Sequence, residues 1–221
     1  MKITPIQALV PKKEVVKDTN AFFKSVKEEF TAGLRDAFFY LQSADSYYLY
    51  SIRTKESSSI GLVCQIDRTS ILDNKILKHE QIIKEKSDLL KGFIMQSGAM
   101  TKPIMTFHQN DDFLLQTYQE IIKETFPIFN IQIGEENHEI YKITDSQTIK
   151  EIEARFESFI PDAFIADGHH RFDSMQKILE ENENLEGIVV VLFGANQVNV
   201  KAYKKLILGL SQEESRALMA Q

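Results

Sequence analysis

The feature that most constrains the fold is a strand-to-helix turn in the last third of the chain. Residues 162–166 form a short, mostly apolar run, and apolar residues then recur at helical spacing over 172–179. This change of period predicts a buried strand that leads directly into a helix. The turn between them reads Asp167-Gly168-His169-His170-Arg171 and gathers more candidate reactive side chains than any other short segment.

The rest of the chain alternates between the same two patterns. The sequence predicts strands at 3–9, 47–53, 60–66, 103–108, 129–133 and 139–143, and helices at 14–41, 80–96, 113–125 and after position 145. The polar stretch 54–59 is of hairpin type, so the strands on either side of it should pair antiparallel. We therefore expect an α+β fold, in which helices flank a mixed sheet.

Composition is that of a folded domain. Of the 221 residues, 43% are hydrophobic, which is enough to fill one core. We expect a single domain over 1–221, or one domain with a small lobe, with its motif-bearing core at about 100–207. The net charge of −6 includes no long basic run, which argues against general nucleic-acid binding. No stretch approaches the ~20 apolar residues of a membrane span. The single Cys64 and the absence of an apolar leader predict a cytoplasmic protein.

The turn at 167–171 has the features of an anion site. The first N–H groups of a helix lack intrahelical partners, and their dipoles favour negative charge. Gly168 would let a ligand approach the backbone, and Arg171 can hold two phosphate or carboxylate oxygens at once. The alternative is structural: Asp167 caps the helix, one histidine donates to a carbonyl, and Arg171 pairs with a surface carboxylate. Because adjacent helical residues point apart, His169 and His170 should not both face one ligand.

A second candidate group is Lys78-His79-Glu80, at the expected start of the helix 80–96. Either His79 and Glu80 reach the same pocket as a base, a ligand or a phosphate contact, or Glu80 only favours the dipole of an exposed helix start. The isolated His108 and His138 occupy strand positions, where we expect core-edge or surface residues and no ligand.

The motif also resembles that of a known family. Residues 165–172 resemble the DGHHR signature of the prokaryotic family called domain of unknown function 1015. Further matches follow the order of that family, at 47–50, 61–63, 78–80, 84–88, 103–104, 189–193 and 203–206, so the likeness spans roughly residues 1–207. The proline-rich segment that usually follows the opening pattern is absent, and members usually continue beyond Gln221. We therefore expect a shortened or truncated homologue.

The resemblance implies a fold and a function. The Gly-x-x-Arg helix start is similar to that of the ParB and sulfiredoxin superfamily, in which such a turn holds nucleotide phosphates and whose members include kinases of small metabolites. By this likeness, a phosphorylated small ligand, ATP or another nucleotide, would be bound by Gly168, His169, His170, Arg171 and His79. Asp167, His169 and Glu80 would be catalytic, and Asp167 and Glu80 would also hold Mg²⁺. The expected reaction is phosphoryl transfer to a small metabolite.

Two other functions stay open. A metal-dependent hydrolase would use Asp167 with His169 or His170, and His79 with Glu80, to hold zinc, manganese or iron and activate a water. No H-E-x-x-H spacing fixes two such ligands on one helix face. A non-catalytic ligand-binding or regulatory protein would keep the anion-binding turn without turnover.

Overall fold

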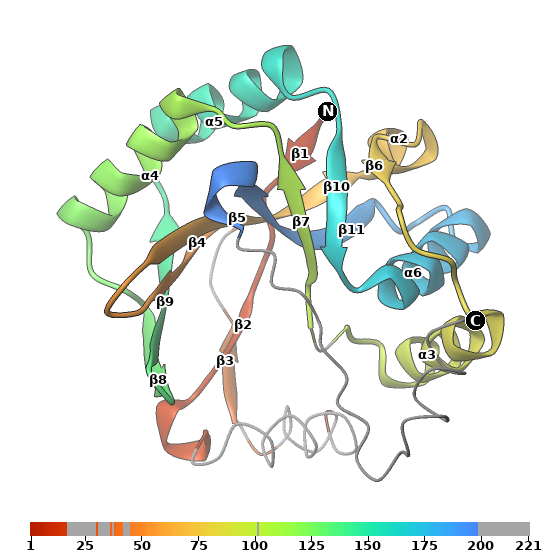
Figure 1. Ribbon diagram of the computed structural model, residues 1–221. Coiled ribbons are helices and arrows are strands. Elements are labelled where there is room, and N and C mark those ends of the chain that lie inside the picture. Colours follow the sequence, from red (N-terminus) through yellow and green to blue (C-terminus); the bar gives the residue numbers. More distant parts are fainter. Residues whose placement is uncertain (17–29, 31–35, 37, 42–44, 101, 199–221) are drawn as a thin grey trace, which may run out of the picture.

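A nine-stranded mixed sheet organises the computed structural model, which describes residues 1–16, 30, 36, 38–41, 45–100 and 102–198. The strand order is β6-β10-β7-β11-β5-β4-β9-β8, with β1 beside β5 (Figure 1). Its strands are β1 (Ile3–Thr4), β4 (Tyr47–Arg53), β5 (Ser58–Asp67), β6 (Ile76–Leu77), β7 (Ile104–His108), β8 (Phe129–Ile133), β9 (Glu136–Ile143), β10 (Ala163–Asp167) and β11 (Gly187–Gly194). A separate pair joins β2 (Leu9–Pro11) to β3 (Phe39–Leu41).

The helices flank this sheet. They are α2 (Arg68–Leu72), α3 (Lys84–Ser97), α4 (Asp112–Glu124), α5 (Ser146–Phe159) and α6 (His169–Glu181), with short 3₁₀ turns η1 (Lys13–Val15) and η2 (Ala195–Gln197). Parallel pairs (β6 with β10, β7 with β11) and antiparallel pairs share one sheet. The predicted α+β class with a mixed sheet is therefore confirmed.

The predicted hairpin is also confirmed. β4 and β5 pair antiparallel from Tyr48 opposite Val63 to Arg53 opposite Ser58, and the Thr54 N–H donates to the Ser57 carbonyl to close the turn. On its other side β4 pairs with β9, so both edges of this aromatic strand are occupied.

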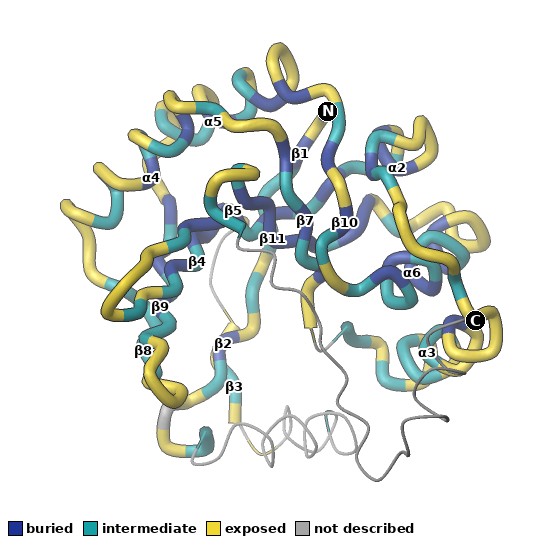
Figure 2. Tube along the Cα trace, viewed as in Figure 1, coloured by how far each residue is buried: buried dark blue, intermediate teal, exposed yellow. Residues whose placement is uncertain are grey.

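One cluster of buried side chains joins the sheet to the helices. It includes Leu62 of β5 and Val190 of β11, and it receives Ile71 of α2, Leu114 of α4, Phe156 of α5 and Phe172 of α6. Figure 2 shows the resulting pattern, with buried residues concentrated along the central strands and exposed residues on the outer sides of α4 and α5. The prediction of a single domain stays a prediction. No helix within the described ranges is long and apolar enough to cross a bilayer.

Two predictions for the N-terminal third were wrong. The strand expected at 3–9 is broken, because the chain leaves β5 after Thr4, bridges Ser46 through Ile6, and pairs with β3 in the smaller sheet only from Leu9. The helix expected at 14–41 does not reach its predicted end, since Phe39–Leu41 is the strand β3. Residues 17–29, 31–35 and 37 of that prediction lie outside the described residues, as does the match at 203–206.

Two further differences concern the segment 67–84. The sequence did not predict α2, whose N-terminus is capped by the Asp67 carboxylate accepting from the Ser70 N–H at 3.0 Å, or the two-residue strand β6. The helix expected at 80–96 begins only at Lys84. Glu80 therefore lies in the preceding loop, and the interpretation of Glu80 as a helix-start residue was wrong.

Candidate functional site

The parallel pairing of β6 with β10 assembles the candidate site. Ile76 lies opposite Ala163, and Leu77 lies opposite Phe164. Because the two strands are parallel, their C-terminal ends lie on the same side of the sheet. The loop that follows β6 carries Lys78-His79-Glu80, and the turn that follows β10 carries the residues 167–171. The structure thus brings together the two segments that the sequence had nominated separately.

Gly168 forms the junction between β10 and α6. Its φ of +99° is a left-handed conformation that favours glycine, and a Cβ there would lie 2.8 Å from Nη2 of Arg171. The guanidinium of Arg171 therefore lies across the glycine. The space that we expected a ligand to use for approaching the backbone is filled, in this structure, by the motif's own arginine.

Asp167 does not cap α6. No side chain caps this helix, whose N-cap residue is Gly168, so the capping role predicted for Asp167 was wrong. Instead the Asp167 carboxylate accepts a hydrogen bond from Nη2 of Arg171 at 2.6 Å. The predicted pairing of Arg171 with a carboxylate thus occurs within the motif itself. The glycine cap leaves the first N–H groups of α6 without a side-chain acceptor.

His169 joins the two segments. Its side chain is only 4% exposed, and its ring lies edge-on to that of His79 with 4.5 Å between the ring centroids. Nδ1 of His169 is 3.3 Å from Oε2 of Glu80. Burial lowers the pKa of His169, and the neighbouring Glu80 carboxylate opposes that shift. The imidazole is consequently held toward its neutral form.

Three consecutive residues of the turn each have a buried polar atom without a partner. They are Nε2 of His169, Nδ1 of His170 and Nε of Arg171, none of which has a hydrogen-bond partner among the described residues. Buried polar atoms in folded proteins are almost always paired with protein groups, water or ligand. The start of α6 therefore presents unused donors and acceptors at adjacent positions.

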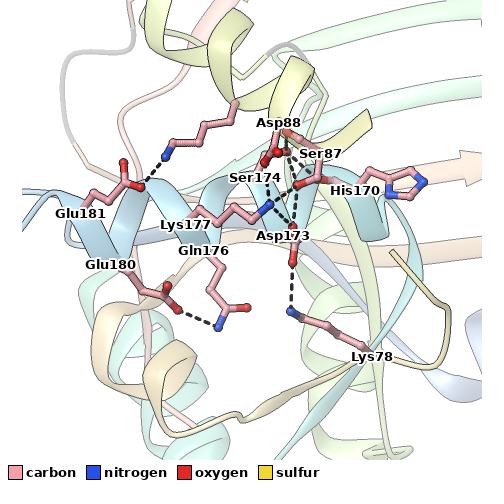
Figure 3. A network of polar contacts seen from close by, with 11 residues as sticks. Lys78, Ser87, Asp88, His170, Asp173, Ser174, Gln176, Lys177, Glu180 and Glu181 are labelled. Atoms are coloured by element: carbon pink, nitrogen blue, oxygen red, sulfur yellow. Dashed lines mark hydrogen bonds and ion pairs between the residues drawn. The ribbon is translucent and has the colours of Figure 1, made fainter. Parts of the chain in front are cut away.

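A polar network fastens α3 and the β6–α3 loop to α6 (Figure 3). The fully buried Ser87 donates to the Asp173 carboxylate at 2.5 Å, and the fully buried Ser174 lies 2.7 Å from both the Ser87 carbonyl and the His170 carbonyl. Asp173 also pairs with Lys177 at 3.0 Å and with Lys78 at 3.6 Å.

This network explains why the loop lies where it does. Lys78 directly precedes His79, and its ammonium group also lies 5.3 Å from the ring centroid of Phe172. Burial alone would raise the pKa of Asp173, but hydrogen bonds from Ser87 and Lys177 lower it, so Asp173 is held as the anion that Lys78 contacts. Figure 3 shows the ring of His170 pointing away from these contacts.

The comparison with known proteins gives a family. The family model described as "Protein of unknown function (DUF1015)" matches residues 7–221, which is nearly the whole chain. The chain belongs to this family. No curated protein and no solved structure matches the DUF1015 chain.

Sequence reasoning missed several residues of the DUF1015 chain that shape this site. Asp173, Ser174 and Lys177 were not singled out, and Ser87 was named only within the family match at 84–88. A signal exists in α6, where Ser174 lies between the buried Phe172 and Met175, so a small polar residue occupies a core-facing position. Such a residue needs a hydrogen-bond partner, which here comes from α3.

The two isolated histidines lie outside the site. His108 is buried and packs edge-on against Phe156, with 5.3 Å between ring centroids, so it is a core residue and not a core-edge one. Its Nδ1 lies 2.6 Å from the Gln109 carbonyl. His138 is bonded through Nδ1 to the Tyr50 hydroxyl at 2.7 Å. In the described part of the DUF1015 chain, no group of three or more His, Cys, Asp or Glu side chains is arranged to hold a metal ion.

Proposed function

We propose that this DUF1015 protein binds a phosphate-bearing small molecule, and specifically a nucleotide, at the N-terminus of α6. The observation that carries the proposal is the row of buried, unpartnered atoms in His169, His170 and Arg171 at a helix start that no side chain caps. A phosphate oxygen would accept from Nε of Arg171 and from the N–H groups of the helix start, and the helix dipole favours its charge. The likeness to the Gly-x-x-Arg turns of the ParB and sulfiredoxin superfamily supports the nucleotide.

The surrounding carboxylates suit the cation that accompanies a nucleotide. Asp167 is 74% exposed and Glu80 is 64% exposed, so the oxygens of both are accessible. Mg²⁺ usually takes one or two protein carboxylates and completes its coordination with phosphate oxygens and water. Asp167 and Glu80 would hold the cation, which would neutralise charge on the phosphates when bound.

Phosphoryl transfer to a small metabolite is the reaction we propose for this site. His169 suits a proton acceptor, because Glu80 beside Nδ1 favours a proton there and burial disfavours the charged ring, which leaves Nε2 as a bare lone pair. The hydroxyl of an acceptor would give its proton to that nitrogen. Asp167 could serve as an additional base, and His79 would limit the access of water to His169.

The other functions have less support. The hydrolase would need its metal ligands to move together, because the described side chains form no three-residue cluster of suitable ligands. A non-catalytic binding protein would use the same anion site. Only the absence of phosphoryl transfer would distinguish it from a kinase. A cytoplasmic location also stays a proposal, supported by the free thiol of Cys64.

Thermal unfolding with and without phosphate compounds tests the binding. ATP, ADP, CTP, phosphoserine and inorganic phosphate are each added with magnesium and with a chelator. A compound at a hundred times its dissociation constant should raise the unfolding free energy by about 2.7 kcal/mol. Arg171→Ala should abolish this shift, because it removes the guanidinium that would hold the phosphate. The variant should still fold, because the substitution lies in a turn and removes nothing from the core.

Two further variants sharpen the test. Arg171→Lys keeps the charge but loses the fork, so it should retain only part of the shift. Lys123→Ala removes an exposed cation of α4 and should leave the shift unchanged. An unaltered shift in Arg171→Ala would contradict the proposed site, and so would the absence of a shift with every phosphate compound. Transfer from ATP to small hydroxylated metabolites, compared with His169→Gln, then separates catalysis from binding alone.

A further inference from the structure

We propose that Asp167 is a built-in competitor for its own anion site: its carboxylate occupies Arg171 until a phosphate group displaces it. This inference rests on the proposed function and concerns how that site is regulated. It predicts that removing a charged residue of the motif strengthens binding, which is the opposite of what a direct ligand contact would give.

The geometry of the guanidinium gives the first argument. The side edge of an arginine presents Nε and Nη2 as a parallel pair of donors to one anion. In Arg171, Nη2 is bonded to Asp167 at 2.6 Å, whereas Nε is buried and has no partner among the described residues. Asp167 therefore occupies half of the fork. A phosphate that takes Nε together with Nη2 would compete with the carboxylate for Nη2.

Exposure gives the second argument. The Arg171 side chain is 22% exposed and lies across Gly168, so its position is fixed by close contact with the backbone. Asp167 is 74% exposed and can therefore swing into solvent without opening the core. Exposed ion pairs contribute little to stability, so the carboxylate can be replaced by a stronger anion.

The local charge gives the third argument. Asp167 neutralises Arg171, and Glu80 adds a further negative charge beside His169. The nearest cation on the adjoining loop, Lys78, faces Asp173. An arriving anion therefore meets little net positive charge while Asp167 stays in place. Removing the Asp167 charge both frees the fork and ends the repulsion between the carboxylate and the ligand.

Calorimetric titration with inorganic phosphate tests the inference. The titration is run in a chelator, so that no divalent cation at Asp167 enters the comparison. Asp167→Asn keeps the shape of the side chain and removes its charge, and Asp167→Ala removes the acceptor as well. Both variants should bind phosphate roughly three- to tenfold more tightly than the unaltered protein. Asp162→Asn is the matched control, because Asp162 directly precedes β10 at the opposite end from the site and faces Lys75, and it should leave the affinity unchanged.

The outcomes separate this inference from the proposed function. If the unaltered protein binds phosphate and both Asp167 variants bind it equally or more weakly, Asp167 is not a competitor, although the site stands. If Asp162→Asn strengthens binding as much as Asp167→Asn, net charge explains the effect and the inference fails. If neither the unaltered protein nor the Asp167 variants bind phosphate while circular dichroism shows them folded, the proposed site is wrong and the inference falls with it.

Discussion

At the scale of single residues, Gly168 holds the turn in a conformation that other residues adopt at a cost. Gly168→Ala combines a positive φ with a clash against the guanidinium of Arg171. We expect it to lower the unfolding free energy by about 1–2 kcal/mol and to weaken phosphate binding, because Arg171 must move. Urea unfolding and phosphate titration measure the two effects.

Gly92 provides the matched control for this substitution. It is exposed within α3, and a Cβ at that position would meet no other atom within 4 Å. Gly92→Ala should therefore raise the unfolding free energy by up to about 1 kcal/mol, as expected for a helix interior. Equal effects at the two glycines would show that the turn has no special requirement at 168.

The two buried histidines predict how stability depends on pH. Burial lowers the pKa of His108 and of His169 in the folded state, while the unfolded chain keeps an ordinary histidine pKa near 6.5. Below that value the unfolded state binds more protons than the folded state, so stability should be full above about pH 6.5 and fall as the pH drops toward the lowered pKa. Urea unfolding at a series of pH values measures this loss. The double variant His108→Gln/His169→Gln should show a flatter decline, and an unchanged slope would assign the decline to other groups.

The sequence identified the residues of the site better than their contacts. It nominated His169, Arg171, His79 and Glu80, and the structure places His79 and Glu80 against His169, whereas Arg171 pairs with Asp167. It did not predict that Arg171 would be bonded to the neighbouring Asp167, because a carboxylate four residues before an arginine can equally cap the helix. Burial and geometry decide between those arrangements, and neither is visible in residue order.

At the scale of secondary structure, the buried contacts between α3 and α6 should contribute more to the unfolding free energy than the exposed ones. Ser87→Ala removes the hydroxyl that donates to Asp173 and leaves a charged, partly buried acceptor with one partner fewer. We expect a loss of about 1–3 kcal/mol of unfolding free energy. Glu181→Gln removes the exposed pair with Lys91 that also joins these helices, and it should cost less than about 1 kcal/mol. Similar losses for both would mean that burial adds nothing to the Ser87 contact.

The elements with a long and regular hydrophobic pattern were predicted most accurately. β4 and β8 have the predicted bounds, and α4 differs from its prediction by one residue at each end. Among the elements that were missed, α2, β3 and β6 have five, three and two residues, which is too short for a hydrophobic period to show. α3 begins at Lys84, and its first turn contacts α6 through Ser87, a pairing that the sequence of α3 alone does not reveal.

At the scale of the whole molecule, Cys64 reports whether the described fold unfolds as one unit. Its thiol is fully buried in β5 near the middle of the sheet, and burial raises its pKa. A thiol reagent should label it at least about a thousandfold more slowly than the exposed Lys55→Cys, because labelling requires global opening. Labelling and circular dichroism should show the same urea midpoint if one domain is present. Rapid labelling of Cys64 at low urea would show that the sheet opens separately from the helices.

The order of the strands is the part that residue patterns could not supply. Each strand can be recognised from a few neighbouring residues, but pairing depends on segments far apart in the chain. β6 lies beside β10 although more than eighty residues separate them, and that one parallel pairing creates the site. A prediction of elements alone therefore names both halves of the site without placing them in contact.

The pairing of β6 with β10 also has a consequence for synthesis. His79 leaves the ribosome ninety residues before His169. At a translation rate of roughly 5–20 residues per second, the loop after β6 waits on the order of 5–20 s for the turn that completes it. During that interval the nascent chain exposes the edge of β6 that β10 will later cover, so a chaperone bound before β10 is made would protect this edge.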